Sequence, residues 1–314
     1  MRRAGLVIML ACAPMWAQVE GPLFGYLPDG AHLRPVYGIP ASASIGPAAN
    51  FGRDFANIAV SPHQDFAVVS AADSGAVLLA SPAGTISAIA GADSKPDRVL
   101  LSPRGSAALL WFSATGRLQI VTGLPNAPTV RTADTSFLSG IPHTLAVSDD
   151  GQYAAGAWVE GIWLFGPQGQ ATPLTLPSRQ RAVSLAFFGG RQDLAVATNT
   201  RVFSIAGVGA AATPSTLYEG DWMLPVGVGL SADNQHIVIP EGTGKLLVLD
   251  LAAGSSAQFD CGCSPEGAYS MGRSVFRFTG LTGAVFKVFD ASTGEVFFVP
   301  LAAQSAQADQ GARR

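Results

Sequence analysis

Lysine is nearly absent from this chain, and charged residues of any kind are scarce. Only 13% of the 314 residues are charged, and the lysines are Lys95, Lys245 and Lys287. The 19 basic residues face 22 acidic ones, which gives a formal net charge of −3. A surface that binds nucleic acid neutralises phosphates with clustered lysines and arginines, and no such run occurs outside the two ends of the chain. The composition therefore argues against nucleic acid as a partner.

Cysteine is also rare, with 3 in the whole chain. Residues 1–17 are predicted to form an export signal, because Arg2 and Arg3 precede an apolar stretch of suitable length. Cleavage would leave two cysteines, too few for a disulfide scaffold, so a hydrophobic core must stabilise the mature chain. An alternative is that Cys12, after Met9-Leu10-Ala11, is a lipidated cysteine. Either way, export predicts a periplasmic or secreted protein.

Long apolar runs are missing after the export signal. No later segment approaches the uninterrupted run of about 18 apolar residues that a membrane-spanning helix needs. We therefore expect no transmembrane segment once the signal is removed. No stretch keeps a helical period of apolar residues for long either, which argues against an α/β fold.

Motifs with recognised catalytic or metal chemistry are absent as well. The histidines (His32, His63, His143 and His236) lack the spacing of a zinc site and have no neighbouring His-x-Glu or Cys-x-x-Cys. The sequence has no Gly-x-Ser-x-Gly, the commonest marker of a serine hydrolase. The stretch from Glu241 to Lys245 lacks the spacing and the following helix of a phosphate-binding loop. No catalytic residue, metal or cofactor is therefore predicted.

The chain does contain an internal repeat of about forty residues. In each copy a short apolar strand runs into a polar turn and a second apolar strand follows, as around Ser148-Asp149-Asp150-Gly151. Serine or aspartate at the start of such a turn, and glycine near its end, are typical of a hairpin closed by a residue with positive φ. The turns begin at Ser61, Ser102, Ser148, Phe188, Ser231 and Ser270, at intervals of 41, 46, 40, 43 and 39 residues.

Each turn is followed by signals for two more strands. The third strands are nearly continuous apolar runs, as expected when both faces of a sheet are covered. The fourth strands, such as Thr85–Ala90 and Glu295–Pro300, are more mixed and suit an outer edge. A four-stranded sheet in every repeat of about forty residues is typical of a propeller blade, and stacked blades cover each other's apolar faces. We therefore predict an all-β fold, a β-propeller of four-stranded antiparallel blades. The predicted third strands are Ala76–Ala80, Arg117–Val121, Gly161–Phe165, Arg201–Ile205, Lys245–Asp250 and Ala284–Phe289.

The repeats also set the expected domain boundaries. Six complete copies of the repeat are expected to form a β-propeller over residues 57–301. Residues 18–56 contain a hairpin, Leu23–Tyr26 with His32–Ile39, that resembles the last two strands of a blade. This hairpin either forms a partial seventh blade or lies over the closure of a six-bladed ring, and we favour seven blades. Residues 302–314 are small and polar and are expected to form a disordered tail.

The turns carry a resemblance to known proteins. Their Ser-Pro-x-Gly and Ser-Asp-Asp-Gly sequences resemble those of WD-repeat-like, TolB-like and YVTN-type propellers of bacteria. The resemblance covers residues 57–300 at the level of the fold. The chain lacks the Gly-His and Trp-Asp pairs of true WD repeats, and it lacks the YVTN tetrapeptide itself. Because these propellers act mostly as rigid binding platforms, the resemblance implies a binding role by analogy.

Cys261-Gly262-Cys263 is the one compact feature with potential reactivity. The two cysteines either fill the connection between the fifth and sixth repeats, form a small-ring disulfide or redox pair, or contribute to a soft metal site. No nearby histidine or further cysteine completes a metal site.

One end of the predicted ring has the composition of a binding surface. The connections from fourth to first strands and from second to third strands meet at this end, and they carry arginine, tryptophan and mixed charges. Trp222, beside Asp221 in a polar connection, offers a large apolar surface with one hydrogen-bond donor. The predicted binding residues are Arg98, Trp158, Glu160, Arg181, Asp221, Trp222 and Glu241.

Two hypotheses for function follow. The first is a non-catalytic extracytoplasmic propeller that binds an envelope or extracellular protein, or a small ligand. The second is a propeller enzyme of the lyase, lactonase or hydrolase kind with its site at the central channel. Three or four convergent carboxylates or histidines in the channel would favour the enzyme, whereas a broad patch of aromatic residues and arginine on one rim would favour binding.

Overall fold

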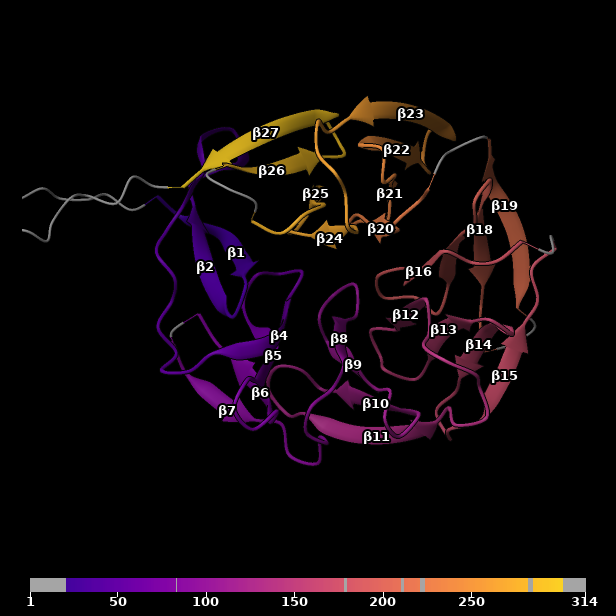
Figure 1. The fold of residues 1–314 in the computed structure, drawn as a ribbon. Coiled ribbons are helices and arrows are strands. Elements are labelled where there is room, and N and C mark those ends of the chain that lie inside the picture. The colour runs from indigo at the N-terminus through magenta and orange to yellow at the C-terminus, as the bar shows by residue number, and fades with distance from the viewer. Residues whose placement is uncertain are drawn as a thin grey trace, which may run out of the picture.

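The protein is described by a computed structural model, which covers residues 21–82, 84–177, 180–209, 212–220, 224–281 and 285–301. Its strands form seven sheets arranged as a ring around a central channel (Figure 1). We number them blades 1 to 7 in chain order. The all-β prediction and the favoured count of seven blades are confirmed. Within the described residues the only helix is the 3₁₀ segment η1 (Pro40–Ser42).

Blades 2 to 7 each contain four antiparallel strands in sequence order from the centre outward. The innermost strands are β4 (Phe55–Val60), β8 (Arg98–Leu101), β12 (Thr144–Val147), β16 (Ser184–Phe187), β20 (Gly229–Leu230) and β24 (Tyr269–Ser270). The second strands are β5 (Ala67–Ala71), β9 (Ala107–Phe112), β13 (Ala154–Trp158), β17 (Leu194–Ala197), β21 (His236–Pro240) and β25 (Val275–Arg277). The third strands are β6 (Val77–Ala80), β10 (Arg117–Thr122), β14 (Gly161–Phe165), β18 (Arg201–Ala206), β22 (Lys245–Asp250) and β26 (Val285–Asp290). The outer strands are β7 (Ile86–Ala88), β11 (Thr129–Asp134), β15 (Ala171–Leu174), β19 (Thr213–Glu219), β23 (Ser255–Asp260) and β27 (Glu295–Pro300).

The core of the molecule is divided among the blade interfaces. Buried side chains form seven clusters, and each cluster joins two neighbouring blades. Third strands such as β6 and β22 are mostly buried, as their continuous apolar runs predict, whereas outer strands such as β23 are largely exposed. Each sheet therefore covers the apolar face of the next, and burial at about 25 cal/mol per Å² stabilises the ring without a disulfide scaffold.

The repeated turns have the predicted conformation. In the turn of blade 4, Gly151 has a φ of 61° and its N–H donates to Ser148 O. The Ser148 N–H donates to Tyr153 O, which closes the hairpin. The last copy differs by one residue, because Met271 N–H donates to Val275 O. Met271, and not Ser270, therefore occupies the position of the other turn serines, and this turn is one residue shorter.

Blade 1 differs from the other six. It contains three strands, β1 (Leu23–Asp29), β2 (His32–Tyr37) and β3 (Ser44–Ile45), in that order from the channel outward. The hairpin was predicted to resemble the last two strands of a blade, but Tyr26 of β1 reaches the central cavity, and β3 lies outside β2. Ile45 of β3 forms a parallel bridge to Leu301, directly after β27, so blade 1 and blade 7 meet and close the ring (Figure 1).

Several predicted segments lie outside the described residues. These are the export signal 1–17 with its Cys12 and the tail 302–314. Within the described part of the chain, no helix has the length and apolar character needed to cross a membrane.

Candidate functional site

The two sets of connections that were predicted to carry the binding residues meet at one end of the ring. We call it the loop rim and define it by the described connections after outer strands and the turns between second and third strands. In blade 5, Gln180 of a connection donates to Thr200 of a turn, with Nε2 and Oγ1 2.6 Å apart. In blade 6, Pro225 of the next connection bridges to Glu241 of a turn. The two sets of loops therefore meet at one end, as predicted.

The connection of residues 135–143, which we call the β11–β12 loop, is fixed at several points on this rim. The Thr135 hydroxyl donates to Gly116 O over 2.7 Å, and Leu138 is buried in the core between blades 3 and 4. Two predicted binding residues hold the rest of the loop. The Glu160 carboxylate accepts the Ser139 N–H at 2.9 Å, and the Arg98 guanidinium donates to Pro142 O at 2.9 Å.

The charges of Arg98 and Glu160 therefore position a loop, which sequence reasoning did not foresee. Hydrogen bonding by Ser139 keeps the pKa of Glu160 below its ordinary value, so the carboxylate is ionised at neutral pH and accepts from the loop. A surface loop with anchors of this kind loses little conformational freedom when it meets a partner.

The anchored loop presents apolar side chains to solvent. Phe137 is 52% exposed and Ile141 59%, and Val159 in the adjacent β13–β14 turn is 57% exposed. The Phe137 ring packs edge-on against Trp163 with centroids 5.1 Å apart, which fixes its orientation. Neither Phe137 nor Ile141 was singled out from the sequence. The available signal was the same as for Trp222, namely large apolar residues in a connection between two strands.

Trp158 does not belong to this surface. Its side chain is only 2% exposed and packs against Trp111 and Phe165, at centroid distances of 6.2 and 5.9 Å. The prediction that Trp158 contributes to the binding face is therefore wrong. It is the last residue of β13, and the neighbouring blade covers it.

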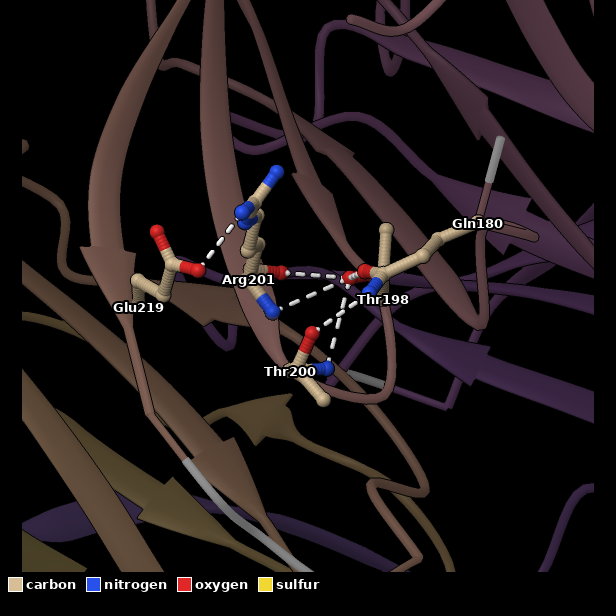
Figure 2. A network of polar contacts seen from close by, with 5 residues as sticks. All are labelled: Gln180, Thr198, Thr200, Arg201 and Glu219. Atoms are coloured by element: carbon tan, nitrogen blue, oxygen red, sulfur yellow. Dashed lines mark hydrogen bonds and ion pairs between the residues drawn. The ribbon is translucent and has the colours of Figure 1, made fainter. Parts of the chain in front are cut away.

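Blade 5 contributes a polar part of the loop rim (Figure 2). Thr198 donates to Gln180 Oε1 over 2.6 Å and accepts the Arg201 N–H at 3.0 Å. The Arg201 guanidinium extends away from this group and pairs with Glu219 at 2.6 Å. Arg181 follows Gln180 directly and is exposed, so this predicted binding residue does lie at the rim.

The remaining predicted rim residues divide into two groups. Asp221 and Trp222 lie outside the described residues, although Gly220 before them donates to Thr200 O at the rim. Glu241 is buried under the blade 6 turn, where its carboxylate accepts from the Thr243 hydroxyl at 3.2 Å. Its burial leaves it little area for contact with a partner.

Cys261 and Cys263 form a disulfide, which decides between the alternatives left open by the sequence. The small loop closed by this disulfide is held against blade 7, because Lys287 of β26 donates to the carbonyls of Cys261 and Gly262. The Asp260 carboxylate accepts the Gly262 N–H at 2.7 Å.

The central channel contains a cavity of about 270 Å³. The inner strands of blades 2 to 7 line it, mostly with aliphatic side chains, together with Tyr26, Tyr269 and Arg277. The enzyme hypothesis called for convergent carboxylates or histidines here, and the described lining contains neither. Across the described residues no cluster of three or more histidine, cysteine or acidic side chains has the geometry of a metal site.

Comparisons with known proteins support the fold of this chain and no finer assignment. No family model matches the chain, and no curated protein matches it. Among solved structures the chain is similar to apo AztD from Citrobacter koseri, with a TM-score of 0.57 and 13% sequence identity. The match covers 89% of this chain and 94% of that chain. At this identity the likeness shows a shared architecture alone, and it supports the fold-level resemblance to bacterial propellers that the turns indicate.

Proposed function

We propose that this protein is a non-catalytic extracytoplasmic β-propeller that binds a partner protein through its loop rim. The observation that carries the proposal is the group of Phe137, Ile141 and Val159, three apolar side chains more than half exposed on loops that are themselves anchored. Exposed apolar groups that cluster on a rigid surface are typical of interaction sites, and aromatic residues supply much of the binding energy there.

The partner is expected to cover these side chains with its own apolar residues. Arg181, on the neighbouring part of the rim, is proposed to extend the contact by pairing a partner carboxylate, and the sequence-based proposal that Trp222 contributes is kept. The location outside the cytoplasm is supported by the pattern of residues 1–17. N-terminal sequencing of mature protein starting near Gln18 would agree with export, whereas an intact Met1 or a lipid on Cys12 would contradict this cleavage.

Site-specific photo-crosslinking tests the binding face. A photoreactive residue is placed at Phe137 or Ile141 in the cells that produce the protein. The matched control position is Ile39, which is 58% exposed in the connection after β2. We expect one discrete adduct from positions 137 and 141 and none from 39, and the Arg181→Ala variant should weaken the adduct at an unchanged melting temperature. Equal labelling at all three positions, or no adduct from the rim, would end the proposal.

A further inference from the structure

The inner edge of blade 1 is built differently from that of every other blade. The Tyr26 N–H, on the edge of β1 away from β2, donates to the side-chain Oε1 of Gln64 at 2.8 Å. Gln64 is buried, and its amide nitrogen also donates to Ser61 O at 3.0 Å. A glutamine side chain thus takes the place of a backbone partner at the free edge of β1. Blade 1 contributes Tyr26 to the described lining of the central cavity, which also contains residues of β24 and β25 of blade 7.

Arg277 lines this cavity. It lies on β25 of blade 7, and its guanidinium carbon sits 4.0 Å above the centre of the Tyr269 ring. At the equivalent position of blade 6 the side chain is Val238, which is fully buried in the core between blades 6 and 7. Blade 7 therefore has a cation, Arg277, at the position where blade 6 has the aliphatic residue Val238.

The guanidinium has unused hydrogen-bonding capacity. Nη1 of Arg277 donates to Thr279 O at 3.1 Å, and no ion pair to Arg277 is found among the described residues. An arginine carries five N–H donors in a planar fork that matches a carboxylate. Burial lowers the pKa of Arg277 to about 10, although electrostatic attraction to Tyr269 and Glu266 partly offsets the decrease. The side chain therefore remains charged at neutral pH.

The rest of the cavity favours an apolar ligand body. Ile58, Leu100, Leu145 and Leu185 from four consecutive blades face the same space as Arg277. Tyr269 is 41% exposed, so the cavity is in contact with solvent through the channel. Its volume of about 270 Å³ is close to the lower limit for ligand sites, which suits a small molecule.

We propose that the central channel binds a small monocarboxylate with an apolar body. The carboxylate pairs with the guanidinium of Arg277 above Tyr269, and the body lies along the aliphatic wall. Arg277 is the one basic residue in the described lining of the cavity, which suits a single negative charge, and burial against the aliphatic wall should favour each added methylene of the ligand. This site lies in the channel at the end of blade 7 next to Thr279 of the loop rim, and it does not depend on the function proposed for Phe137, Ile141 and Val159.

Calorimetric titration with straight-chain probes tests the site. Hexanoate is expected to bind with a Kd of about 1 mM or tighter, and hexanol at least about tenfold more weakly. From butanoate to hexanoate, each methylene should tighten binding about fourfold, as expected for burial in an apolar space. No heat from any carboxylate up to about 10 mM, or equal binding of hexanol, would overturn the proposal.

Two variants locate the site within the channel. Arg277→Gln should weaken hexanoate binding about tenfold or more, whereas Arg117→Gln, at an exposed position of β10, should leave it unchanged. Ala59→Leu narrows the cavity from blade 2 while keeping Arg277, and it should abolish binding even if Arg277→Gln does not fold. Unchanged affinity in folded Arg277→Gln or in Ala59→Leu would refute the site. Phe137→Ser should not affect hexanoate binding, which separates this result from the test of the rim.

Discussion

At the scale of single residues, a few side chains replace contacts that the repeat does not provide. Gln64 is the clearest case, because its side chain satisfies the Tyr26 N–H on the open edge of β1. The packing is close: a Cβ added to Gly25 would lie 2.7 Å from Gln64 Oε1. The glycine therefore lets the glutamine reach the strand, and the glutamine gives a buried donor its partner.

Replacing Gln64 should reveal that role. Gln64→Leu keeps the volume but leaves the buried Tyr26 N–H without an acceptor, which should cost about 1–3 kcal/mol of unfolding free energy. Gln152→Leu, with an exposed side chain in the turn of blade 4, is the control and should change stability by less than about 0.5 kcal/mol. Urea denaturation measures both. Equal effects would show that the Gln64 side chain is not needed at β1.

Gly151 tests the turn conformation predicted from the sequence. Its φ is 61°, and an added Cβ would meet Thr122 of blade 3 at 2.1 Å. Gly254 has a φ of 62° with nothing within 4 Å of such a Cβ, so it isolates the backbone cost. We expect Gly254→Ala to cost about 1–2 kcal/mol and Gly151→Ala to cost about 1–3 kcal/mol more, measured by chemical denaturation. Similar losses in the two variants would mean that Thr122 moves aside freely.

What the sequence could predict at this scale depended on whether a residue acts locally. The positive φ of Gly151 follows from turn chemistry within four residues, and it was foreseen. Trp158 was placed wrongly because its burial comes from blade 3, whose contacts leave no local pattern. The roles of Arg98 and Glu160 were missed for the same reason, since each meets a backbone group of another segment.

At the scale of elements, the repeated turns join one another across blades. Asp149 links three blades, because its carboxylate accepts the Arg104 N–H at 2.7 Å and the Gly190 N–H at 2.6 Å. Asn234 continues the chain of contacts by exchanging two hydrogen bonds with Gly189. The repeat spacing predicted the turns themselves, but the side chains that join them come from different blades, and their pairing required the ring geometry.

A carboxylate that accepts a hydrogen bond from one of these turns should make stability depend on acid. Asp290 accepts from the hydroxyls of Ser274 and Ser292, each at 2.7 Å. Burial alone would raise the pKa of Asp290, but these hydrogen bonds outweigh it and leave the pKa below its ordinary value. Because the unfolded chain then binds more protons, the contribution is complete above about pH 4 and is lost as pH falls through the folded-state pKa.

The measurement is the unfolding free energy between about pH 5 and pH 2. Stability should fall over this range, and Asp290→Asn should be less stable at neutral pH with a shallower acid dependence. Asp93→Asn, at an exposed position, serves as the control and should follow the unmodified protein. If Asp290→Asn kept the full acid dependence, the hydrogen bonds from Ser274 and Ser292 would not be a source of it.

At the scale of the whole molecule, the blade count could be predicted only in part. Six copies of a turn are visible in the sequence, and their spacing alone implies a ring of at least six sheets. Blade 1 lacks that turn and the strand before it, so its place in the ring is not encoded in the repeat. Its position follows instead from packing, because Leu27, Val36 and Ile45 share a buried cluster with blade 7.

This packing makes blade 1 the closure of the ring, which gives a final prediction. Ile45 is 1% exposed, packs in the cluster with blade 7, and pairs with Leu301. Ile45→Ala should cost about 2–5 kcal/mol, as should Ile237→Ala in the interface between blades 5 and 6. The two should differ in where the structure opens. A stack whose ends no longer meet frays from its ends, so Ile45→Ala should speed amide hydrogen exchange most in β1–β3 and β24–β27. Faster exchange confined to the interior blades, or spread evenly around the ring, would show that β3 and Leu301 do not close it.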